Sequence, residues 1–534
     1  MPIKAFERLI IWVVVVAVLL SAISLGSAQA QGAFFAGAAK AKITPQSPVW
    51  LAGYDPNRRS AAVHDDLWAR ALVLKAGDQL LALASVDLIG FPNIYLQRVR
   101  EMVKGVPADA IIVSATHNHS GPDLIGLWGP TPGESGVDKA YLDSVIRTVA
   151  QVIEQAAADT KPATVKYAAG DLAKASKNIR IKEILDTELA ALQAVGEDGK
   201  PVATLVNFAC HPAIMNNDNV TADFCNWTYQ RIEGKGGGLA LFVNGAQGGM
   251  ITADVDDIPE QSKGNWDDAA RIGNAIADRA LEVLSSAQPV ADASITLRGG
   301  ELRVPVGNPT FEAAFEAGVL PDVREEGKIK TEIMAGSIGR AEFVTIPGEA
   351  FPNLDLLLKR WMTGDVKFVF GITQDELGYI MSREDYGLKL YEYEASMSVG
   401  PETGRLLVDA LLPLIEAVNP KSAAASGEAS ALDAWFFALP DRFNAAAAGN
   451  LKAIFYFDVT GEGGGDYTIN VVDGKCAVEK RKPERADLKG TISASDATLV
   501  ATGKLDPVAA WSMGKLVFDG DMPLAMLMVQ IFGF

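Results

Sequence analysis

The stretch Ile111-Ile-Val-Ser-Ala-Thr-His-Asn-His-Ser-Gly-Pro122 joins a short apolar run to two closely spaced histidines. The run has the near-continuous apolar character of a strand that is buried on both faces. In extended backbone, residues i and i+2 project to the same side, so we expect His117 and His119 to face one pocket at the carboxyl end of this strand. Ligands of open α/β sheets bind at that end.

Strands and helices alternate on both sides of this stretch. Ala71–Lys75 and Leu80–Val86 read as buried strands, whereas Tyr95–Lys104 and Tyr141–Ala157 carry the three-to-four-residue apolar spacing of helices that pack on a sheet. This alternation predicts a large α/β domain with a mixed sheet, over residues 32–419.

A composition that is small and polar marks residues 420–430 as a linker. Beyond it, a helix over Leu432–Phe443 and strands over Ile454–Val459 and Tyr467–Val472 predict a small α+β domain with an antiparallel meander, over residues 431–534. The final segment, Met522–Phe534, is apolar all round. Such a helix needs burial, inside a lipid-binding tunnel or against another apolar surface.

The first thirty residues are expected to form a signal peptide. Lys4 and Arg8 precede an apolar run, and Ala28-Gln29-Ala30 is a small-x-small cleavage pattern. The protein is therefore expected to be exported, to the periplasm or the medium, or held at the membrane if this segment stays uncleaved.

Bulk composition excludes some classes of function. A net charge of −18 without a basic cluster argues against a nucleic-acid partner. Three cysteines are too few for a disulfide framework; Cys210 and Cys225 either form one bridge or remain core thiols.

Histidine is rare in this chain, and three of the four histidines stand in two compact motifs. His211 follows the apolar run Ala203–Cys210, so it also lies at a strand end. Imidazole is the commonest zinc ligand, and a catalytic zinc takes about three protein ligands. Histidines at two strand ends therefore indicate a zinc site.

Residues 34–420 resemble the neutral, non-lysosomal ceramidase family. Ala39-Lys-Ala-Lys-Ile-Thr-Pro45, Leu51-Ala-Gly-Tyr54, His64-Asp-Asp-Leu-Trp-Ala-Arg70, Thr116–Pro122 and Phe208-Ala-Cys-His-Pro212 are similar to blocks of that family. The resemblance implies that His117 and His211 bind zinc and that His119 supports the transition state.

Later segments complete the implied site. Ile346-Pro-Gly-Glu-Ala-Phe351 resembles the stretch whose glutamate binds zinc, which nominates Glu349. The segment that begins at Gly378 implies Tyr379 as a zinc ligand and Tyr391 as a hydrogen-bond donor to the substrate. Arg180 is the arginine candidate, although it stands one residue away from the family position and could equally be a solvated surface charge.

The resemblance fails in the segment Asn244-Gly-Ala-Gln-Gly-Gly-Met-Ile-Thr-Ala253, where Ile251 stands in place of the family serine that contacts the lipid head group. An apolar side chain cannot replace a group that reads a hydroxyl. We therefore expect a retained metal centre with ceramide itself as a doubtful substrate. The glycines fit either close approach of the backbone to a ligand or a plain tight turn.

Residues 431–534 resemble the sterol-carrier-protein type of lipid-binding domain. The matching blocks are Phe457-Asp-Val-Thr-Gly461, Val472-Asp-Gly-Lys-Cys476, Gly503-Lys-Leu-Asp-Pro507 and Gly514-Lys-Leu-Val-Phe-Asp-Gly-Asp521. The resemblance implies a hydrophobic tunnel capped by the terminal helix, with the same residues filling a core or a domain interface as the alternative. The residues suited to the cap are Leu524, Met526, Leu527, Met528, Ile531 and Phe532.

The sequence thus predicts a zinc-dependent hydrolase that cleaves an amide or related acyl bond of a lipid-like or N-acylated substrate, with association at a membrane surface as an accessory expectation. The alternative is a non-catalytic lipid carrier with a degenerate hydrolase domain.

Overall fold

The computed structural model describes residues 34–256, 262–290, 293–321, 323–418, 431–461 and 463–532. The expected signal segment (residues 1–30) and the expected linker (residues 420–430) lie outside the described residues, so neither expectation is tested. Among the described helices, none has the length and apolar character needed to cross a membrane.

The larger domain is built on an eight-stranded mixed sheet in the order β11-β9-β8-β6-β1-β3-β4-β5. The edge pairs β4·β5 and β9·β11 are parallel, and the inner pairs are antiparallel. Both faces of this sheet are covered, which explains why its strands read as near-continuous apolar runs. The strands are β1 (Phe34–Lys42), β3 (Trp68–Ala76), β4 (Gln79–Val86), β5 (Ile111–Ala115), β6 (Lys161–Asp171), β8 (Glu188–Gly196), β9 (Pro201–Phe208) and β11 (Leu239–Asn244).

Four helices cover one face of this sheet: α2 (Asn93–Met102), α3 (Lys139–Ala158), α4 (Phe224–Gly234) and α5 (Trp266–Ser285). The apolar stripe of α3, which includes Val145 and Val149, is fully buried against the sheet. Asp138 caps this helix by accepting hydrogen bonds from the first-turn backbone. The helices predicted from apolar spacing are confirmed in α2 and α3.

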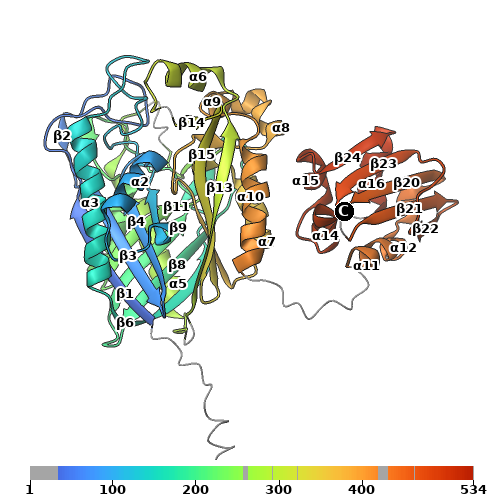
Figure 1. Cartoon of the computed structure of the whole chain (residues 1–534), viewed down its shortest axis with the longest axis horizontal. Coiled ribbons are helices and arrows are strands. Elements are labelled where there is room, and N and C mark those ends of the chain that lie inside the picture. Colours follow the sequence, from blue (N-terminus) through green and yellow to red (C-terminus); the bar gives the residue numbers. More distant parts are fainter. Residues whose placement is uncertain are drawn as a thin grey trace, which may run out of the picture.

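A second sheet covers the other face. It contains β13 (Ile295–Pro305), β15 (Lys328–Ile338), β16 (Ala341–Thr345) and β18 (Val366–Phe370), and its outer side carries α7 (Pro352–Trp361) and α10 (Thr403–Val418). A core that includes Leu83, Leu205 and Phe343 fills the space between the two sheets. The domain is therefore layered as helices, sheet, sheet and helices (Figure 1), in agreement with the predicted α/β class.

The C-terminal domain has a five-stranded sheet in the order β22-β21-β20-β23-β24. β20 to β22 form the predicted antiparallel meander, but β23 pairs in parallel with β20, so the sheet as a whole is not a meander. The helix predicted over Leu432–Phe443 is two helices, α11 (Ala431–Phe437) and α12 (Leu439–Arg442), because Pro440 starts the second one. The sheet strands are β20 (Ala453–Thr460), β21 (Gly465–Val472), β22 (Lys475–Glu479), β23 (Leu488–Ser493) and β24 (Leu516–Gly520).

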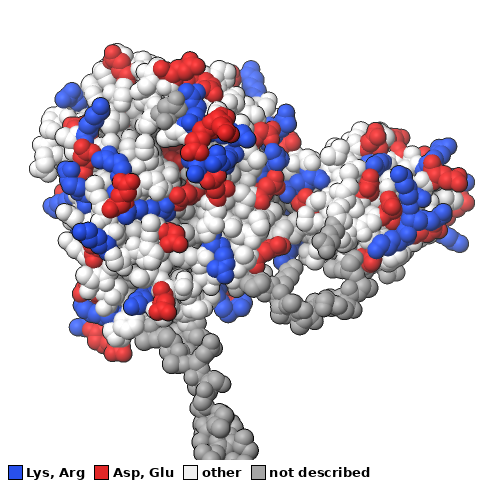
Figure 2. All heavy atoms as spheres, viewed as in Figure 1, with Lys and Arg blue, Asp and Glu red and all other residues white. Residues whose placement is uncertain are grey.

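Helices α14 (Ala494–Ala501), α15 (Pro507–Ser512) and α16 (Met522–Phe532) pack on this sheet, which gives the predicted α+β character. The small domain meets the larger one at an ion pair: Lys515 Nζ lies 3.2 Å from Asp409 Oδ1 on α10. On the face drawn in Figure 2, acidic and basic side chains are interspersed over the larger domain.

Candidate metal centre and its cavity

The two histidines after β5 face each other across a bend in the chain. His117 has φ +67°, so the backbone here is left-handed and the expectation of an extended i, i+2 pair gave the wrong reason. The expected outcome nevertheless holds, since the ring centroids of His117 and His119 lie 5.0 Å apart. A Cβ on Gly53, whose φ is +102°, would lie 2.4 Å from the His119 ring, so only glycine fits there.

His211 follows β9, and its ring lies 5.1 Å from that of His117. The buried Asn244, at the end of β11, ties the two histidine segments together. Its Nδ2 donates to the Thr116 carbonyl and to the Cys210 carbonyl, each at 2.9 Å. This one amide therefore holds together strand ends that are far apart in the sheet order.

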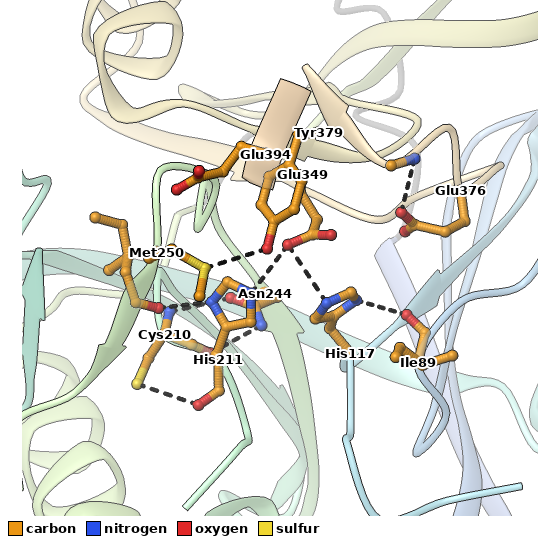
Figure 3. A network of polar contacts seen from close by, with 12 residues as sticks. Ile89, His117, Cys210, His211, Asn244, Met250, Glu349, Glu376, Tyr379 and Glu394 are labelled. Carbon is orange, nitrogen blue, oxygen red and sulfur yellow. Dashed lines mark hydrogen bonds and ion pairs between the residues drawn. The ribbon is translucent and has the colours of Figure 1, made fainter. Parts of the chain in front are cut away.

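Backbone carbonyls fix the orientation of two imidazoles. Nδ1 of His117 lies 2.7 Å from the Ile89 carbonyl oxygen, and Nδ1 of His211 lies 2.7 Å from the Ile251 carbonyl oxygen. A carbonyl only accepts, so each Nδ1 carries the proton and each Nε2 presents a lone pair. Both Nε2 atoms point at Glu349 Oε2, at 3.4 Å and 2.9 Å (Figure 3).

This arrangement calls for a cation. Two lone pairs and a carboxylate oxygen repel one another unless a proton or a metal ion lies between them. Burial lowers the pKa of His117 to about 4, which disfavours the proton. The chemistry of this buried donor set, two imidazoles and a carboxylate, suits Zn²⁺.

Tyr379 reaches the same centre through a short parallel pairing of β17 (Glu349–Ala350) with β19 (Tyr379–Ile380), which places Glu349 directly beside Tyr379. The phenol contacts the sulfur of Met250 at 3.3 Å and hydrogen-bonds to Glu349. Burial raises the pKa of Glu349, but the nearby imidazoles and the Tyr379 hydrogen bond lower it by more, so the carboxylate stays ionised.

His119 completes a cluster of three histidines whose ligand atoms lie within 4.8 Å of one another. Both of its ring nitrogens are buried and lack a hydrogen-bond partner in the described structure. Burial, then the neighbouring His117, His211 and Arg58, lower the pKa of His119 well below its ordinary value. This neutral ring is thus available to a metal ion or to a substrate.

Of the other two sequence candidates, Tyr391 packs in one cluster with Tyr379, and Arg180 pairs with Glu394, a neighbour of Tyr379. Tyr391 is buried with its ring 4.8 Å from that of Phe351, and burial raises its pKa to about 12. Arg180 forms a bidentate pair with the fully buried Glu394, at 2.7 Å and 3.2 Å, and its charge opposes the rise in the Tyr391 pKa. Glu394 lies beside Tyr379 (Figure 3).

A cavity of about 530 Å³ opens beside the centre, and His117, Glu349 and Glu376 are part of its wall. Most of the remaining wall residues are apolar, and α2, α6 (Pro309–Glu316) and β15 each contribute part of the wall. An apolar cavity with a few convergent polar groups is the usual form of a small-molecule site.

The glycine-containing loop that leads into β12 (Ile251–Ala253) packs tightly against the backbone of Glu349. A Cβ on Gly248 would lie 2.3 Å from the Glu349 carbonyl oxygen, so the glycines allow close approach to protein backbone. The Ile251 side chain is fully buried, and only its carbonyl serves the centre. Cys210 and Cys225 are both free thiols, which selects the second of the two expectations for them.

Solved structures similar to the larger domain are ceramidases. The neutral ceramidase from Pseudomonas aeruginosa aligns with a TM-score of 0.60 at 20% identity, over 74% of this chain and 77% of that chain. A ceramidase described as complexed with C2 gives a TM-score of 0.60 at 19% identity, over the same shares of the two chains. The larger domain has the neutral ceramidase fold.

The C-terminal part has a different relative. Residues 436–533 match the family model described as the SCP-2 sterol transfer family. Hydroxysteroid dehydrogenase-like protein 2 from Xenopus tropicalis is 32% identical over 114 residues, which cover 21% of this chain and 27% of that protein. Sterol carrier protein 2 from Oryctolagus cuniculus is 41% identical over 79 residues, 14% of each chain. The chain thus spans about a quarter or less of the curated relatives that it matches. A ceramidase-like domain followed by an SCP-2-like domain confirms the resemblance expected from the sequence.

The SCP-2-like domain contains a second cavity, of about 220 Å³, with an almost wholly apolar wall. Of the six residues expected to cap it, Met526 and Met528 line the cavity, whereas Ile531 and Phe532 are buried in the domain core. The terminal helix thus both lines the apolar cavity and fills part of the domain core, which were the two alternatives that the sequence left open.

Three parts of the ceramidase-like site could not be predicted from the sequence. The Ile89 carbonyl has no side-chain signature, and Glu376 and Glu394 look like ordinary surface acids in the sequence. Gly53 did have a signal, because it stands in the quoted block Leu51-Ala-Gly-Tyr54.

Proposed function

We propose that the ceramidase-like domain is a zinc-dependent hydrolase that cleaves an N-acyl amide, or a related acyl bond, of an amphipathic substrate. One observation carries the proposal: His117, His211 and Glu349, from three distant segments, converge beside a largely apolar cavity that His117 and Glu349 line. The low identity to solved ceramidases supports the fold alone, so the activity rests on this geometry.

We assign His117, His211, Glu349 and Tyr379 as the zinc ligands. A zinc ion held by them supplies Lewis acidity, which polarises the scissile carbonyl and makes water a stronger acid. The carbonyls of Ile89 and Ile251 keep both Nε2 atoms turned to the centre, and Met250 and Glu349 hold the Tyr379 phenol in place.

His119 and Tyr391 are assigned to the substrate. The neutral His119 ring has no protein partner, so its N–H can donate to the developing oxyanion. Its other nitrogen can accept the proton released by the attacking water and return it to the departing amine. The Tyr391 phenol stays protonated at neutral pH and so remains a donor. Arg180 acts through Glu394 and Tyr391, as a positioning residue.

The SCP-2-like domain is proposed to hold or present the lipid-like substrate, since its apolar cavity offers burial for a hydrocarbon chain. Residues 1–30 are proposed to direct export, with residues 32–419 forming the hydrolase domain and residues 420–430 joining it to residues 431–534. No nucleic-acid partner is proposed.

The competing proposal is a lipid carrier whose larger domain is inactive. Metal analysis separates the two, because a carrier has no physical need for a metal centre. We expect about one zinc per chain in the purified protein, lost in His211→Ala and retained in the control His64→Ala, whose histidine stacks on Trp266 away from the centre.

Activity is tested by a hydrolysis screen over N-acyl amines, acyl amino acids, lactones and ceramides, with and without a chelator. We expect chelator-sensitive hydrolysis that His119→Ala reduces by about 100-fold or more while its zinc content persists. A metal-free protein that still binds acyl chains would establish the carrier instead.

A further inference from the structure

Glu376 has a polar atom that the metal centre does not use. Its Oε1 accepts a hydrogen bond from the Gly378 backbone at 3.0 Å, whereas its Oε2 is buried and has no partner in the described structure. Glu376 lines the same cavity as His117 and Glu349 and stands beside them in Figure 3. A buried polar atom without a partner costs free energy, which a bound ligand recovers.

The neighbouring carboxyl groups of the cavity already have protein partners. Asp375 accepts hydrogen bonds from the Asn93 and Glu376 backbones, at 3.0 Å and 2.9 Å. Glu332 pairs with Arg100 at 2.6 Å, and Glu325 pairs with Arg303 at 3.3 Å. Of these four carboxyl groups in the described structure, Glu376 is the one with an oxygen that is both buried and without a hydrogen-bond partner.

The fold makes room for this side chain. A Cβ on Gly90 would lie 2.7 Å from Cγ and 2.8 Å from Cβ of Glu376, so only glycine leaves the present position of Glu376 free. Gly90 directly follows Ile89, whose carbonyl orients His117. The Ile89–Gly90 segment therefore both leaves room for Glu376 and orients His117 at the candidate metal centre.

A hydroxyl is the ligand group that suits this position. Burial raises the pKa of Glu376 well above its ordinary value, which disfavours the ionised form that an ammonium partner would need. A hydroxyl can donate to a carboxylate and can also accept from a carboxylic acid. Apolar side chains, with Ile89, Ile125 and Leu377 among them, make up most of the cavity wall.

We propose that Glu376 is a specificity-determining residue, which selects substrates that carry a hydroxyl close to the scissile bond. This inference rests on the proposed hydrolase function and deepens it. The Ile251 side chain is buried in the core and cannot read a hydroxyl, so we assign polar recognition in this chain to Glu376, in the loop between β18 and β19.

The test uses the zinc-loaded full chain and two matched pairs of substrates. N-dodecanoyl ethanolamine is compared with N-dodecanoyl propylamine, and a 2-hydroxyacyl amide is compared with its 2-methylacyl analogue. In at least one pair we expect kcat/KM to favour the hydroxyl by about tenfold or more. In Glu376→Leu this ratio is expected to fall to about twofold or less with the zinc content intact, and Glu376→Gln, which preserves volume, is expected to keep part of it.

Glu325→Gln is the matched control, since it alters a cavity carboxyl that already has a partner, and it should leave the ratio unchanged. A wild-type ratio near one in both pairs overturns the proposal, as does a ratio that survives in Glu376→Leu. A third substrate that carries an ammonium group in place of the hydroxyl overturns the hydroxyl assignment if it is preferred.

Failure of the hydrolase function is recognised separately, as absence of chelator-sensitive turnover in the wild type. In that case the same pairs are compared by calorimetric binding to the zinc-loaded wild type and to Glu376→Leu. The cavity of the SCP-2-like domain contributes equally to both proteins, so the difference between them reports Glu376. An equal difference for hydroxyl and methyl ligands overturns the proposal.

Discussion

At the scale of single residues, two backbone carbonyls decide which nitrogen of His117 and of His211 faces the candidate metal centre. The Ile251 carbonyl serves His211 although the Ile251 side chain is buried elsewhere. Because a carbonyl is common to all residues, this position can change its side chain and still orient the histidine. The replacement of the family serine by Ile251 therefore leaves the orientation of His211 unchanged.

Asp87 supports a prediction about pH. It is fully buried, accepts hydrogen bonds from the Tyr229 phenol at 2.7 Å and the Trp68 backbone at 2.8 Å, and burial raises its pKa from 3.8 to about 7. The folded state therefore holds this proton more tightly than the unfolded state. The stabilisation from this group is complete below about pH 4 and is lost as the pH rises towards 7, with a slope of up to about 1.4 kcal/mol per pH unit.

Asp87→Asn removes this titration. We expect the free energy of unfolding, measured by urea denaturation between pH 4 and pH 8, to fall less steeply with pH in the variant than in the wild type. Asp143→Asn, which alters an exposed carboxyl, serves as the control. Parallel pH profiles for Asp87→Asn and the wild type would contradict this account.

At the scale of elements, two very short strands position two of the proposed zinc ligands. β17 and β19 have two residues each, yet their parallel register sets Glu349 beside Tyr379. The glycine-containing loop after β11 packs against this pair of strands, since Gly248 contacts the Glu349 backbone. Such short pairings lack a periodic signal, so only motif order pointed to them.

Gly248→Ala tests this support. The new methyl group would lie 2.3 Å from the Glu349 carbonyl oxygen, so the β17 backbone must shift and carry Glu349 with it. We expect zinc affinity, measured by competition with a chromophoric chelator, to fall about 10-fold to 100-fold. The control is Gly299→Ala on β13, where an added Cβ meets nothing within 4 Å, and equal zinc affinities in the two variants would count against the argument.

At the scale of the whole molecule, each of the two domains contains a largely apolar cavity. The contact between the domains includes the Lys515–Asp409 ion pair, of a kind that contributes at most about 1 kcal/mol at a surface. Under the proposed function, this combination serves a substrate with a long hydrocarbon chain, which the SCP-2-like domain would shelter from water.

A filled second cavity should therefore affect long substrates only. Ala497→Phe places a ring in that cavity, and we expect it to lower kcat/KM for a long-chain N-acyl substrate several-fold while hydrolysis of a short-chain analogue is unchanged. Val517→Phe adds the same ring at a position that is 55% exposed and outside the cavity wall, so it should match the wild type. The check is the ratio of kcat/KM for the long-chain substrate to kcat/KM for the short-chain substrate, measured in the wild type and in both variants.

Much of this architecture was predictable from local patterns. The buried strands β3, β4 and β5 and the helix α3 follow from apolar runs and spacing. The split between α11 and α12 and the left-handed His117 were missed, because a proline near a helix start and a turn after a strand are decided by a few local contacts. The zinc-ligand assignment remains a prediction.

The sequence by itself determined which segments form strands and helices and in what order they follow along the chain. It also determined the division into two domains and the residue types available as metal ligands. Only the tertiary structure decided that these residues meet. β5 and β11 lie at opposite ends of the sheet order, yet Asn244 at the end of β11 donates to the Thr116 carbonyl just after β5. The physical reason is that side-chain periodicity encodes which face of an element is buried, whereas convergence depends on sheet closure and long-range packing, which no local pattern records.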